Sequence, residues 1–600
     1  MKSFFASFFG TLFAIALVTV GGFFLLIGII SLIGSTNKGP TVENKSVLVI
    51  DLSVPISDAP AEFNTSELIS ELSGQENQRV TLRELLRSIS LAATDDRISA
   101  IFLTGNVTPP ANYSSGLAAL REIRDALVRF KQSKKLIYAH LVVPFTKTYY
   151  VASVADKIYL DREEGMAVSG LVSEQLRFAS LLKKFGIGIQ VSKQGKYKSA
   201  VEPFVLDNSS PENTEQVQAL LSDFWSEITS GIEQARGIPA GTVQQLIAQK
   251  GLIDADTALE QKLVTDVEPL TSVMDELKQK YAEDSKNNTF RQITVANYLA
   301  AFDGRIKTAE KGPKVGVVYA EGEIVDGEGD SATVGGDKLA RAVRKFRFDP
   351  DIKAIVLRVN SPGGSALASE VIRSELESTQ KVKPLVVSMG TVAASGGYWI
   401  STAANRVFAE PGTITGSIGV FGLFPNVQKL ANDNGVFWNP IETSPYSSLF
   451  TVSRPKTEAE LAVVQRSIDH IYDDFLKHVS DARHLPVDSV KEIAQGRVWS
   501  GTQAVKLHLV DELGGLGAAI SYAGKLANLG DAPKLTEYPV KKDLNERLKD
   551  LFKGNERPPV SKLDPINREL KALETNLQTL THLNDPQGVY ALLPIGIEWK

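Results

Sequence analysis

Short apolar runs of strand length alternate with longer segments of helical periodicity along most of this chain. The alternation begins at about residue 45 and continues through most of the sequence. Strands that alternate with helices in this way form largely parallel sheets whose faces are covered by the helices. The pattern therefore predicts an α/β fold.

The amino-terminal segment has a different pattern. No charged side chain occurs between Lys2 and Lys38, and residues 8–34 form an apolar run. As a helix this run would be about 40 Å long, which is enough to cross a bilayer with some tilt. The alternative is a cleavable signal peptide, but its apolar region would be only about 7–15 residues long. We therefore expect residues 1–44 to be a retained single-pass anchor, with an orientation that the flanking lysines specify weakly.

The α/β pattern occurs twice in the chain. KSVLVIDLSVPISD, from Lys45, resembles KVGVVYAEGEIVDG, from Lys314. TYYVASVADKIYL aligns with GYWISTAANRVFA, which places Tyr149 on Tyr398 with an offset of 249 positions (398 − 149). The offset holds without a gap for about fifty residues, so the halves are copies of one unit. We expect one domain over 45–295, a second over 296–535 and a tail over 536–600.

The differences between the copies point to chemistry. In the second copy the apolar run PLVVSM leads into GTVAASGGYW, which places Ser395 on a turn at the start of a helix. The first copy has Thr146 at this position, followed by Lys-Thr instead of Gly-Gly. Conversely, Lys198 in GKYKSA of the first copy aligns with Ser447 of the second. One half has kept a serine and the other a lysine.

Composition narrows the chemistry further. With 65 Lys and Arg against 70 Asp and Glu, the net charge of −5 gives no reason to expect a nucleic-acid partner. The absence of cysteine excludes thiolate nucleophiles and thiolate metal sites. The six histidines include no H-E-x-x-H pair, so a zinc peptidase of that type is excluded. Any covalent catalysis must therefore use oxygen or nitrogen.

A serine and a lysine can act together as nucleophile and base. A serine hydroxyl needs a base to remove its proton, and a lysine amine serves only when it is neutral. That requires its pKa to fall by about three units, or about 4 kcal/mol, which burial in an apolar pocket can supply. Lys196 would lie on the same face as Lys198 if the segment were extended. The alignment of the copies favours Lys198.

Two glycine turns are candidates for an oxyanion-binding site. The run AIVLRVN ends in SPGGS, where Gly363 and Gly364 precede a helical pattern, and Gly396 directly follows the candidate nucleophile. Backbone amides at the start of a helix favour negative charge, and each donor to an oxyanion contributes about 3–4 kcal/mol in other enzymes.

Four motifs in this order resemble a known family. SPGGS, AASGGYW, TGSIGV from Thr415 and GKYKSAVEPF from Gly195 are similar to the long, duplicated bacterial form of signal peptide peptidase A, also called protease IV. The resemblance covers residues 45–530 and implies two tandem crotonase-like domains, like those of the Clp protease, after a transmembrane helix.

The resemblance also implies roles for single residues. Ser395 corresponds to the family's nucleophile and Lys198 to its general base, while Ser417 corresponds to a serine that hydrogen-bonds the base. The oxyanion amides correspond to Gly396 and to the Gly363–Gly364 turn. Whether the base reaches the serine of its own chain or of a neighbour stays open.

The family's other properties complete the expectation. They are a homotetramer in the bacterial inner membrane, catalytic domains on the extracytoplasmic side, activity that needs no metal or other cofactor, and hydrophobic peptide substrates, mainly released signal peptides. Two alternatives remain. A crotonase-type acyl-CoA enzyme would bind CoA without depending on Ser395, and an inactive membrane scaffold would retain the duplication for assembly only.

Overall fold

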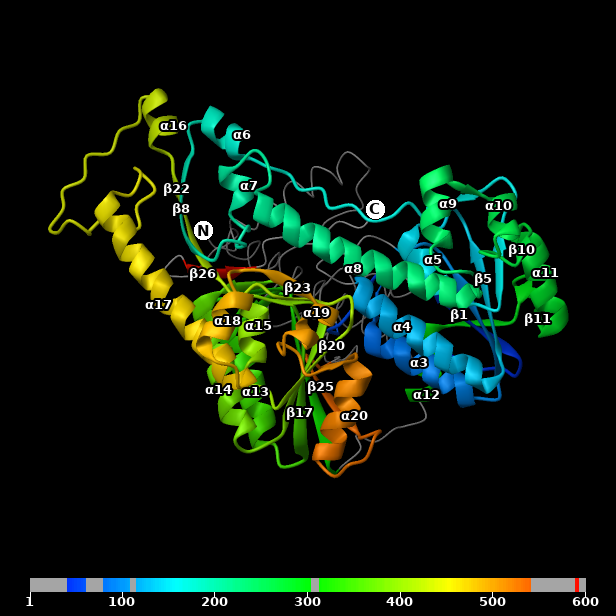
Figure 1. Cartoon of the computed structure of the whole chain (residues 1–600). Coiled ribbons are helices and arrows are strands. Elements are labelled where there is room, and N and C mark those ends of the chain that lie inside the picture. The colour runs from blue at the N-terminus through cyan, green and yellow to red at the C-terminus, as the bar shows by residue number, and fades with distance from the viewer. Residues whose placement is uncertain (1–39, 61–78, 108–114, 304–311, 541–588, 593–600) are drawn as a thin grey trace, which may run out of the picture.

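The computed structural model of the protein describes residues 40–60, 79–107, 115–303, 312–540 and 589–592 (Figure 1). Helices and strands alternate through both halves, as the apolar pattern predicts. The expected membrane anchor at 8–34 lies outside the described residues. Within the described ranges, no helix combines the length and apolar character needed to cross a bilayer.

The first half is built on a six-stranded sheet in which every pairing is parallel. Its order is β10 (Asp266–Val267), β6 (Lys157–Leu160), β5 (Leu136–Leu141), β4 (Ile98–Thr104), β1 (Ser46–Asp51) and β13 (Gln292–Thr294). The central strand β4 is buried along most of its length, as expected for a parallel strand covered on both faces.

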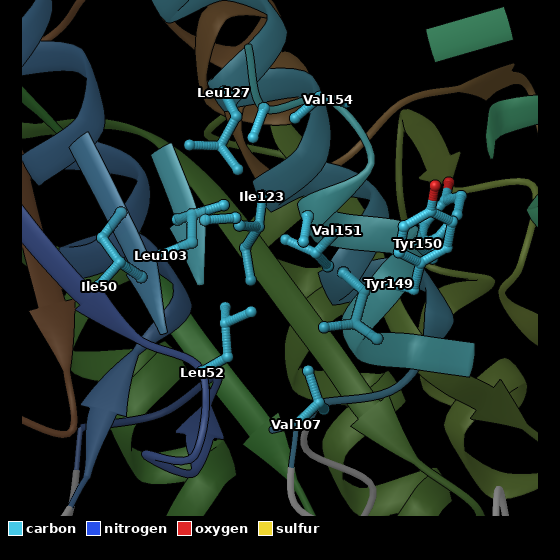
Figure 2. Packing of buried hydrophobic residues seen from close by; sticks show 14 of the residues in the cluster. Ile50, Leu52, Leu103, Val107, Ile123, Leu127, Tyr149, Tyr150, Val151 and Val154 are labelled. Carbon is cyan, nitrogen blue, oxygen red and sulfur yellow. The ribbon is translucent and has the colours of Figure 1, made fainter. Parts of the chain in front are cut away.

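Helices cover this sheet and complete its core. They are α3 (Leu82–Thr94), α4 (Leu117–Phe130), α5 (Thr146–Ala152), α8 (Pro211–Arg236), α9 (Thr242–Lys250), α10 (Ala255–Glu260), α11 (Leu270–Lys280) and α12 (Val295–Asp303). Figure 2 shows side chains from strands and helices meeting in the core, among them Leu103 of β4, Ile123 of α4 and Tyr149 of α5. Helix α3 starts at a capping box in which Thr81 and Glu84 satisfy each other's backbone amides.

The second half repeats the arrangement of the first. The strand order β24-β20-β19-β17-β14-β25 matches β10-β6-β5-β4-β1-β13, and β21 and β23 extend the second sheet beside β19. The duplication seen in the sequence is therefore also a duplication of sheet topology. The strands are β14 (Lys314–Glu321), β17 (Ile352–Ser361), β19 (Leu385–Ala394), β20 (Arg406–Ala409), β21 (Ile414–Gly416), β23 (Val498–Ser500), β24 (Glu512–Leu513) and β25 (Leu535–Tyr538).

The helices of the second half follow the same order. They are α13 (Gly336–Phe348), α14 (Ala366–Gln380), α15 (Gly396–Ser401), α16 (Gln428–Asp433), α17 (Glu458–Arg483), α18 (Val487–Ile493), α19 (Gly501–Lys506) and α20 (Leu516–Leu526). The short elements are β2 (Ile56–Ser57), β3 (Val80–Thr81), β7 (Gly165–Met166), β9 (Ile253–Asp254), β11 (Glu283–Asp284), β12 (Thr289–Phe290), α6 (Ala179–Lys184) and α7 (Glu202–Val205).

A third sheet joins the two halves. Its order is β16 (Thr333–Gly335), β15 (Glu323–Val325), β18 (Gly363–Ser365), β26 (Val589–Leu592), β22 (Val420–Asn426) and β8 (Gly188–Gln194). The edge strand β8 comes from the first half and pairs antiparallel with β22 of the second, from Gln194 opposite Val420 to Gly188 opposite Asn426. This pairing carries the segment that follows β8 into the second half.

A buried ionic cluster also connects the halves. Arg358 of β17 is fully buried, and its guanidinium lies 2.8 Å from Asp58 and 3.0 Å from Glu122, two carboxylates of the first half. Two further carboxyls belong to this region. Glu410 is buried, and burial raises its pKa to about 8. Glu321 is half-buried, accepts from the Asp58 and Ala59 amides, and has its pKa raised by desolvation to about 7. Removing one partner of a buried ion pair leaves an uncompensated charge, so loss of this arginine should destabilise the contact between the halves.

Candidate active site

Ser395 lies at the junction between β19 and α15, directly after the last residue of the strand. Its backbone has φ 55° and ψ −117°, a conformation that non-glycine residues rarely adopt. Its amide donates to the Gly416 carbonyl at 2.8 Å. A Cβ on the neighbouring Gly397 would lie 2.6 Å from the Ser361 carbonyl oxygen, so the turn tolerates only glycine there. The A-S-G-G sequence therefore forms a tight strand-to-helix turn with a strained serine at its apex.

Lys198 reaches this serine from the first half of the same chain. Its Nζ lies 2.7 Å from Ser395 Oγ, 3.0 Å from Ser417 Oγ and 3.1 Å from the Ser417 carbonyl oxygen. All three residues are fully buried. The structure thus brings the lysine and the serine, which different halves retain, into direct contact within one chain.

Burial changes the acid–base character of the lysine. Removal from water lowers the pKa of the Lys198 amine well below its ordinary value of about 10.4. The neighbours of Nζ are hydroxyl and carbonyl oxygens, which hydrogen-bond the amine without supplying a negative charge. A neutral amine beside a serine hydroxyl can accept its proton.

Ser417 holds the amine from the opposite side. It follows β21 with φ 52°, and its amide donates to the Arg497 carbonyl at 2.7 Å. Because both its hydroxyl and its carbonyl oxygen contact Nζ, Ser417 restricts the amine to one position.

The choice between Lys196 and Lys198 is settled by the backbone. The segment after β8 is a turn and not an extended strand, because the Lys198 amide donates to the Gly195 carbonyl at 3.2 Å. Lys196 is exposed and its amine lies over the Tyr197 ring, 5.0 Å from the centroid. The expectation that both lysines share a face, made for an extended segment, therefore does not apply.

A polar network behind the lysine was not found by sequence reasoning. Gln216 of α8 donates from Nε2 to the Tyr197 carbonyl and to Ser199 Oγ, at 3.1 Å each, and accepts from the Val498 amide at 3.2 Å. Asn213 accepts from Ser199 Oγ at 2.8 Å. These side chains tie the lysine turn to β23 of the second half, and no motif in the sequence marks them.

The glycine turns expected to bind an oxyanion lie next to the serine. β17 and β19 are neighbours, with Ser361 opposite Ala393, and the SPGG turn continues from this point into β18, which contacts α15. Gly364 has φ 155°, and a Cβ there would lie 1.9 Å from the Ile324 carbonyl oxygen. The Gly363 amide donates to Ser361 Oγ at 3.2 Å. Gly363, Gly364 and Gly396 are thus gathered at one end of the sheet.

The corresponding position in the first half has a different environment. Thr146 begins α5 without a positive φ, and its hydroxyl lies 3.4 Å from the Gly170 carbonyl oxygen. Lys147, which replaces Gly396, is buried, and burial lowers its pKa to about 7. The strained turn exists only in the second half.

Comparison with known proteins places this site in a family. The sequence profile of "Peptidase family S49" matches residues 129–284 and again residues 377–530, one match in each half. The chain is 34% identical to "Protease 4" of Haemophilus influenzae, over 96% of this chain and 95% of that protein. The chain belongs to peptidase family S49. It is a serine-type peptidase of the duplicated signal peptide peptidase A form.

Two further relatives agree with this placement in family S49. "Protease 4" of Salmonella typhi is 34% identical over 97% of this chain and 94% of its own length. "Serine protease SPPA, chloroplastic" of Arabidopsis thaliana is 29% identical over 92% of this chain and 78% of its own length. The similarity to these relatives thus extends over nearly the whole chain.

Substitution of Gly496 should disturb this S49 site through the lysine. A Cβ at Gly496 would lie 2.7 Å from Lys198 Cβ, so we expect Gly496→Ala to displace the amine and lower kcat/KM for peptide hydrolysis by about 10- to 100-fold. Gly251→Ala is the matched control, because Gly251 also has a positive φ but nothing lies within 4 Å of the added carbon. Equal losses in both variants would attribute the effect to backbone strain alone.

Proposed function

We propose that this S49 peptidase is a membrane-anchored endopeptidase that degrades cleaved signal peptides and other hydrophobic peptides with a Ser395/Lys198 dyad. The observation that carries the proposal is the 2.7 Å contact between Lys198 Nζ and Ser395 Oγ, both fully buried. The match of both sheets in strand order supports two tandem crotonase-like, Clp protease-like domains.

The geometry supports acyl transfer in two steps. Lys198 removes the proton of Ser395 as Oγ attacks the peptide carbonyl, and then protonates the leaving amine. In the second step Lys198 deprotonates a water that releases the peptide from Ser395. Ser417 keeps the amine oriented in both steps. The amides of Gly396 and of the Gly363–Gly364 turn would stabilise the oxyanion.

The third sheet supports a binding mode for extended peptides. β26 pairs antiparallel with β18 on one side and with β22 on the other, and it contacts α15, whose N-cap is Ser395. A peptide in the place of β26 would bind by backbone hydrogen bonds beside the nucleophile. Phe421 and Leu423 of β22 pack with Val201 in an apolar cluster next to this strand, which favours hydrophobic peptides.

The same proposal places the protein in the inner membrane. The apolar run over 8–34 is long enough to span a bilayer. With the catalytic domains on the extracytoplasmic side, the site would meet signal peptides that are left in the membrane after preprotein processing. The assembly proposed is a homotetramer.

A covalent probe tests the proposed dyad. We expect a fluorophosphonate to label the full-length chain in detergent at a single residue, Ser395. Labelling should be lost in Ser395→Ala and in Lys198→Met, and retained in Lys196→Met. Labelling of Ser395→Ala would disprove the assignment of the nucleophile. CoA binding without any serine labelling would favour an acyl-CoA enzyme. The absence of both CoA binding and serine labelling would favour an inactive scaffold.

Removal of the carboxyl-terminal segment should activate the enzyme. Ser395 is fully buried while β26 occupies the slot between β18 and β22, so an incoming peptide must displace this strand. An occupant on the same chain competes at high effective concentration. We expect a chain ending at Val540 to show a several-fold higher kcat/KM, whereas a chain lacking only 593–600 keeps the activity of the full chain. An unchanged or lower kcat/KM after removal of β26 would contradict the competition.

A further inference from the structure

A loop of the second half packs against the lysine turn of the first. The loop comprises residues 494–499, which lead from α18 into β23, and the lysine turn comprises residues 195–199. The Gln495 carbonyl accepts from the Tyr197 amide at 2.9 Å. A Cβ on Gly195 would lie 2.6 Å from the same carbonyl oxygen. The two backbones are therefore in direct contact, with no room for a side chain at Gly195.

The same loop also contacts the turn that carries Ser417. The Arg497 carbonyl accepts from the Ser417 amide at 2.7 Å, and the Gly496 amide donates to the Ile418 carbonyl at 2.8 Å. Ser417 in turn contacts the amine of Lys198 through two oxygen atoms. The loop is thus hydrogen-bonded to both turns that surround the amine.

The Arg497 side chain lies between two aromatic rings. Its guanidinium carbon is 4.8 Å from the centroid of the Tyr197 ring and 4.5 Å from that of the Trp499 ring. Tyr197 directly precedes Lys198 and is buried, while Trp499 belongs to β23. A guanidinium over an aromatic face gains both cation–π attraction and contact area. Arg497 therefore holds the neighbour of the lysine against a strand of the other half.

A carboxylate completes this contact. Glu215 of α8 accepts from Arg497 Nη1 at 2.8 Å and from the Tyr197 hydroxyl at 3.0 Å. Arg497 Nη1 also donates to the Tyr197 hydroxyl oxygen at 3.2 Å. Because the carboxylate neutralises the guanidinium, the cluster adds little net charge near the buried amine. Its effect on the site is therefore geometric.

The first half has no arginine at the corresponding position. GRVWS of the second half corresponds to GLIDA of the first, which places Leu252 at the position of Arg497 (497 − 245). Leu252 is 65% exposed. Val168 occupies the position of Ser417 (417 − 249). The arginine therefore occurs only in the copy that provides both serines of the site.

We propose that Arg497 is a positioning residue of the peptidase. It holds Tyr197 against Trp499 and so fixes the lysine turn. The amine of Lys198 is thereby kept at hydrogen-bond distance from Ser395. The inference rests on the proposed dyad, because the arginine itself takes no part in the chemistry. Proton transfer is sensitive to this distance, since a misplacement of about 1 Å can lower a rate about 100-fold.

Removal of the guanidinium tests this role. We expect Arg497→Met to lower kcat for peptide hydrolysis by about 10- to 100-fold, with KM changed by less than about 3-fold. A looser turn admits water to the Lys198 amine, whose pKa then moves toward the ordinary lysine value. The midpoint of kcat/KM against pH should therefore rise by about half a unit or more. Arg341→Met, the same change at an exposed arginine, should leave kcat and the midpoint unchanged.

Conservative variants separate packing from charge. Arg497→Lys keeps the charge but not the planar guanidinium, so it should lower kcat as Arg497→Met does. Tyr197→Phe keeps the ring and should retain kcat within about 3-fold, whereas Tyr197→Leu should lower kcat as far as Arg497→Met. Since the two side chains act as one contact, the double variant Arg497→Met with Tyr197→Leu should lose no more than either single variant.

Different failures can be told apart. Wild-type kcat in Arg497→Met or in Arg497→Lys would overturn the positioning role. A loss by the same factor at every pH, with reduced circular dichroism, would reduce the arginine to a folding role and also overturn it. Full activity in Lys198→Met would refute the dyad, and the role of Arg497 with it. An inactive Lys198→Met beside a fully active Arg497→Met would leave the dyad standing and refute this inference alone.

Discussion

Replacing Lys198 by Met should lower kcat/KM for peptide hydrolysis by about 10³- to 10⁶-fold, while the protein becomes more stable. The activity falls because the side chain that removes the Ser395 proton is gone. Methionine has a similar length and no charge, so it fills the same buried space. Steady-state hydrolysis of a fluorogenic apolar peptide would measure the first effect and thermal unfolding the second.

The gain in stability follows from the direction of the pKa shift. The pKa of Lys198 is lowered in the folded protein, so between the folded and the unfolded pKa the unfolded chain binds more protons, and stability rises with pH in that window. At neutral pH the wild-type protein is therefore destabilised by this amine and Lys198→Met is not. The same shift requires that kcat/KM rise with pH as the amine loses its proton, with a midpoint below the ordinary lysine pKa.

Two outcomes would contradict this account. Equal hydrolysis by wild type and Lys198→Met would remove the lysine from the mechanism. Loss of activity in the exposed neighbour variant Lys196→Met, to the same extent, would show that the effect is not specific to the buried amine.

Replacing Arg358 by Met should destabilise the protein by about 3–5 kcal/mol at pH 8. The substitution leaves Asp58 and Glu122 buried without the guanidinium that now neutralises them. Burial raises the pKa of Glu122, which contacts the guanidinium, and raises that of Glu410 to about 8, so these carboxyls take up protons as the pH falls and then need less counter-charge. The loss of stability should therefore be smaller at pH 6 than at pH 8.

The control for this experiment is an exposed arginine. Arg341 pairs with Glu328 at the surface, where both side chains are more than half exposed, so Arg341→Met should cost only about 0–1 kcal/mol. Denaturant unfolding at pH 6 and pH 8 measures the free energy of unfolding of the wild type, Arg358→Met and Arg341→Met. A similar small loss in both variants, or a loss in Arg358→Met that does not change with pH, would show that the buried cluster does not hold the halves together.

Much of the architecture was predictable because it is repeated. The apolar runs of each half have strand length and are followed by helical patterns, and one constant offset relates the copies, so the matching sheet orders follow from local sequence. The proximity of Ser395 and Lys198 was also predictable from the repeat, because the first half keeps only the lysine and the second half keeps only the serine.

The remaining features depend on contacts between residues far apart in the sequence. Arg358 and Asp58 are 300 positions apart, and nothing near either residue indicates the other. Gln216 of α8 hydrogen-bonds the Tyr197 carbonyl in the lysine turn, which lies outside its own helix. The periodicity of apolar residues indicates which face of a segment is buried. It does not indicate which distant side chain completes a polar network.

The insertion of β8 beside β22 has a consequence for biosynthesis. Strand β8, which directly precedes the lysine turn, is translated more than two hundred residues before β22, the strand it pairs with, and Ser395 lies between them in the order of synthesis. A nascent chain emerging from the ribosome has no assembled dyad until β22 has also emerged. The order of synthesis therefore delays the assembly of the dyad until both strands are available.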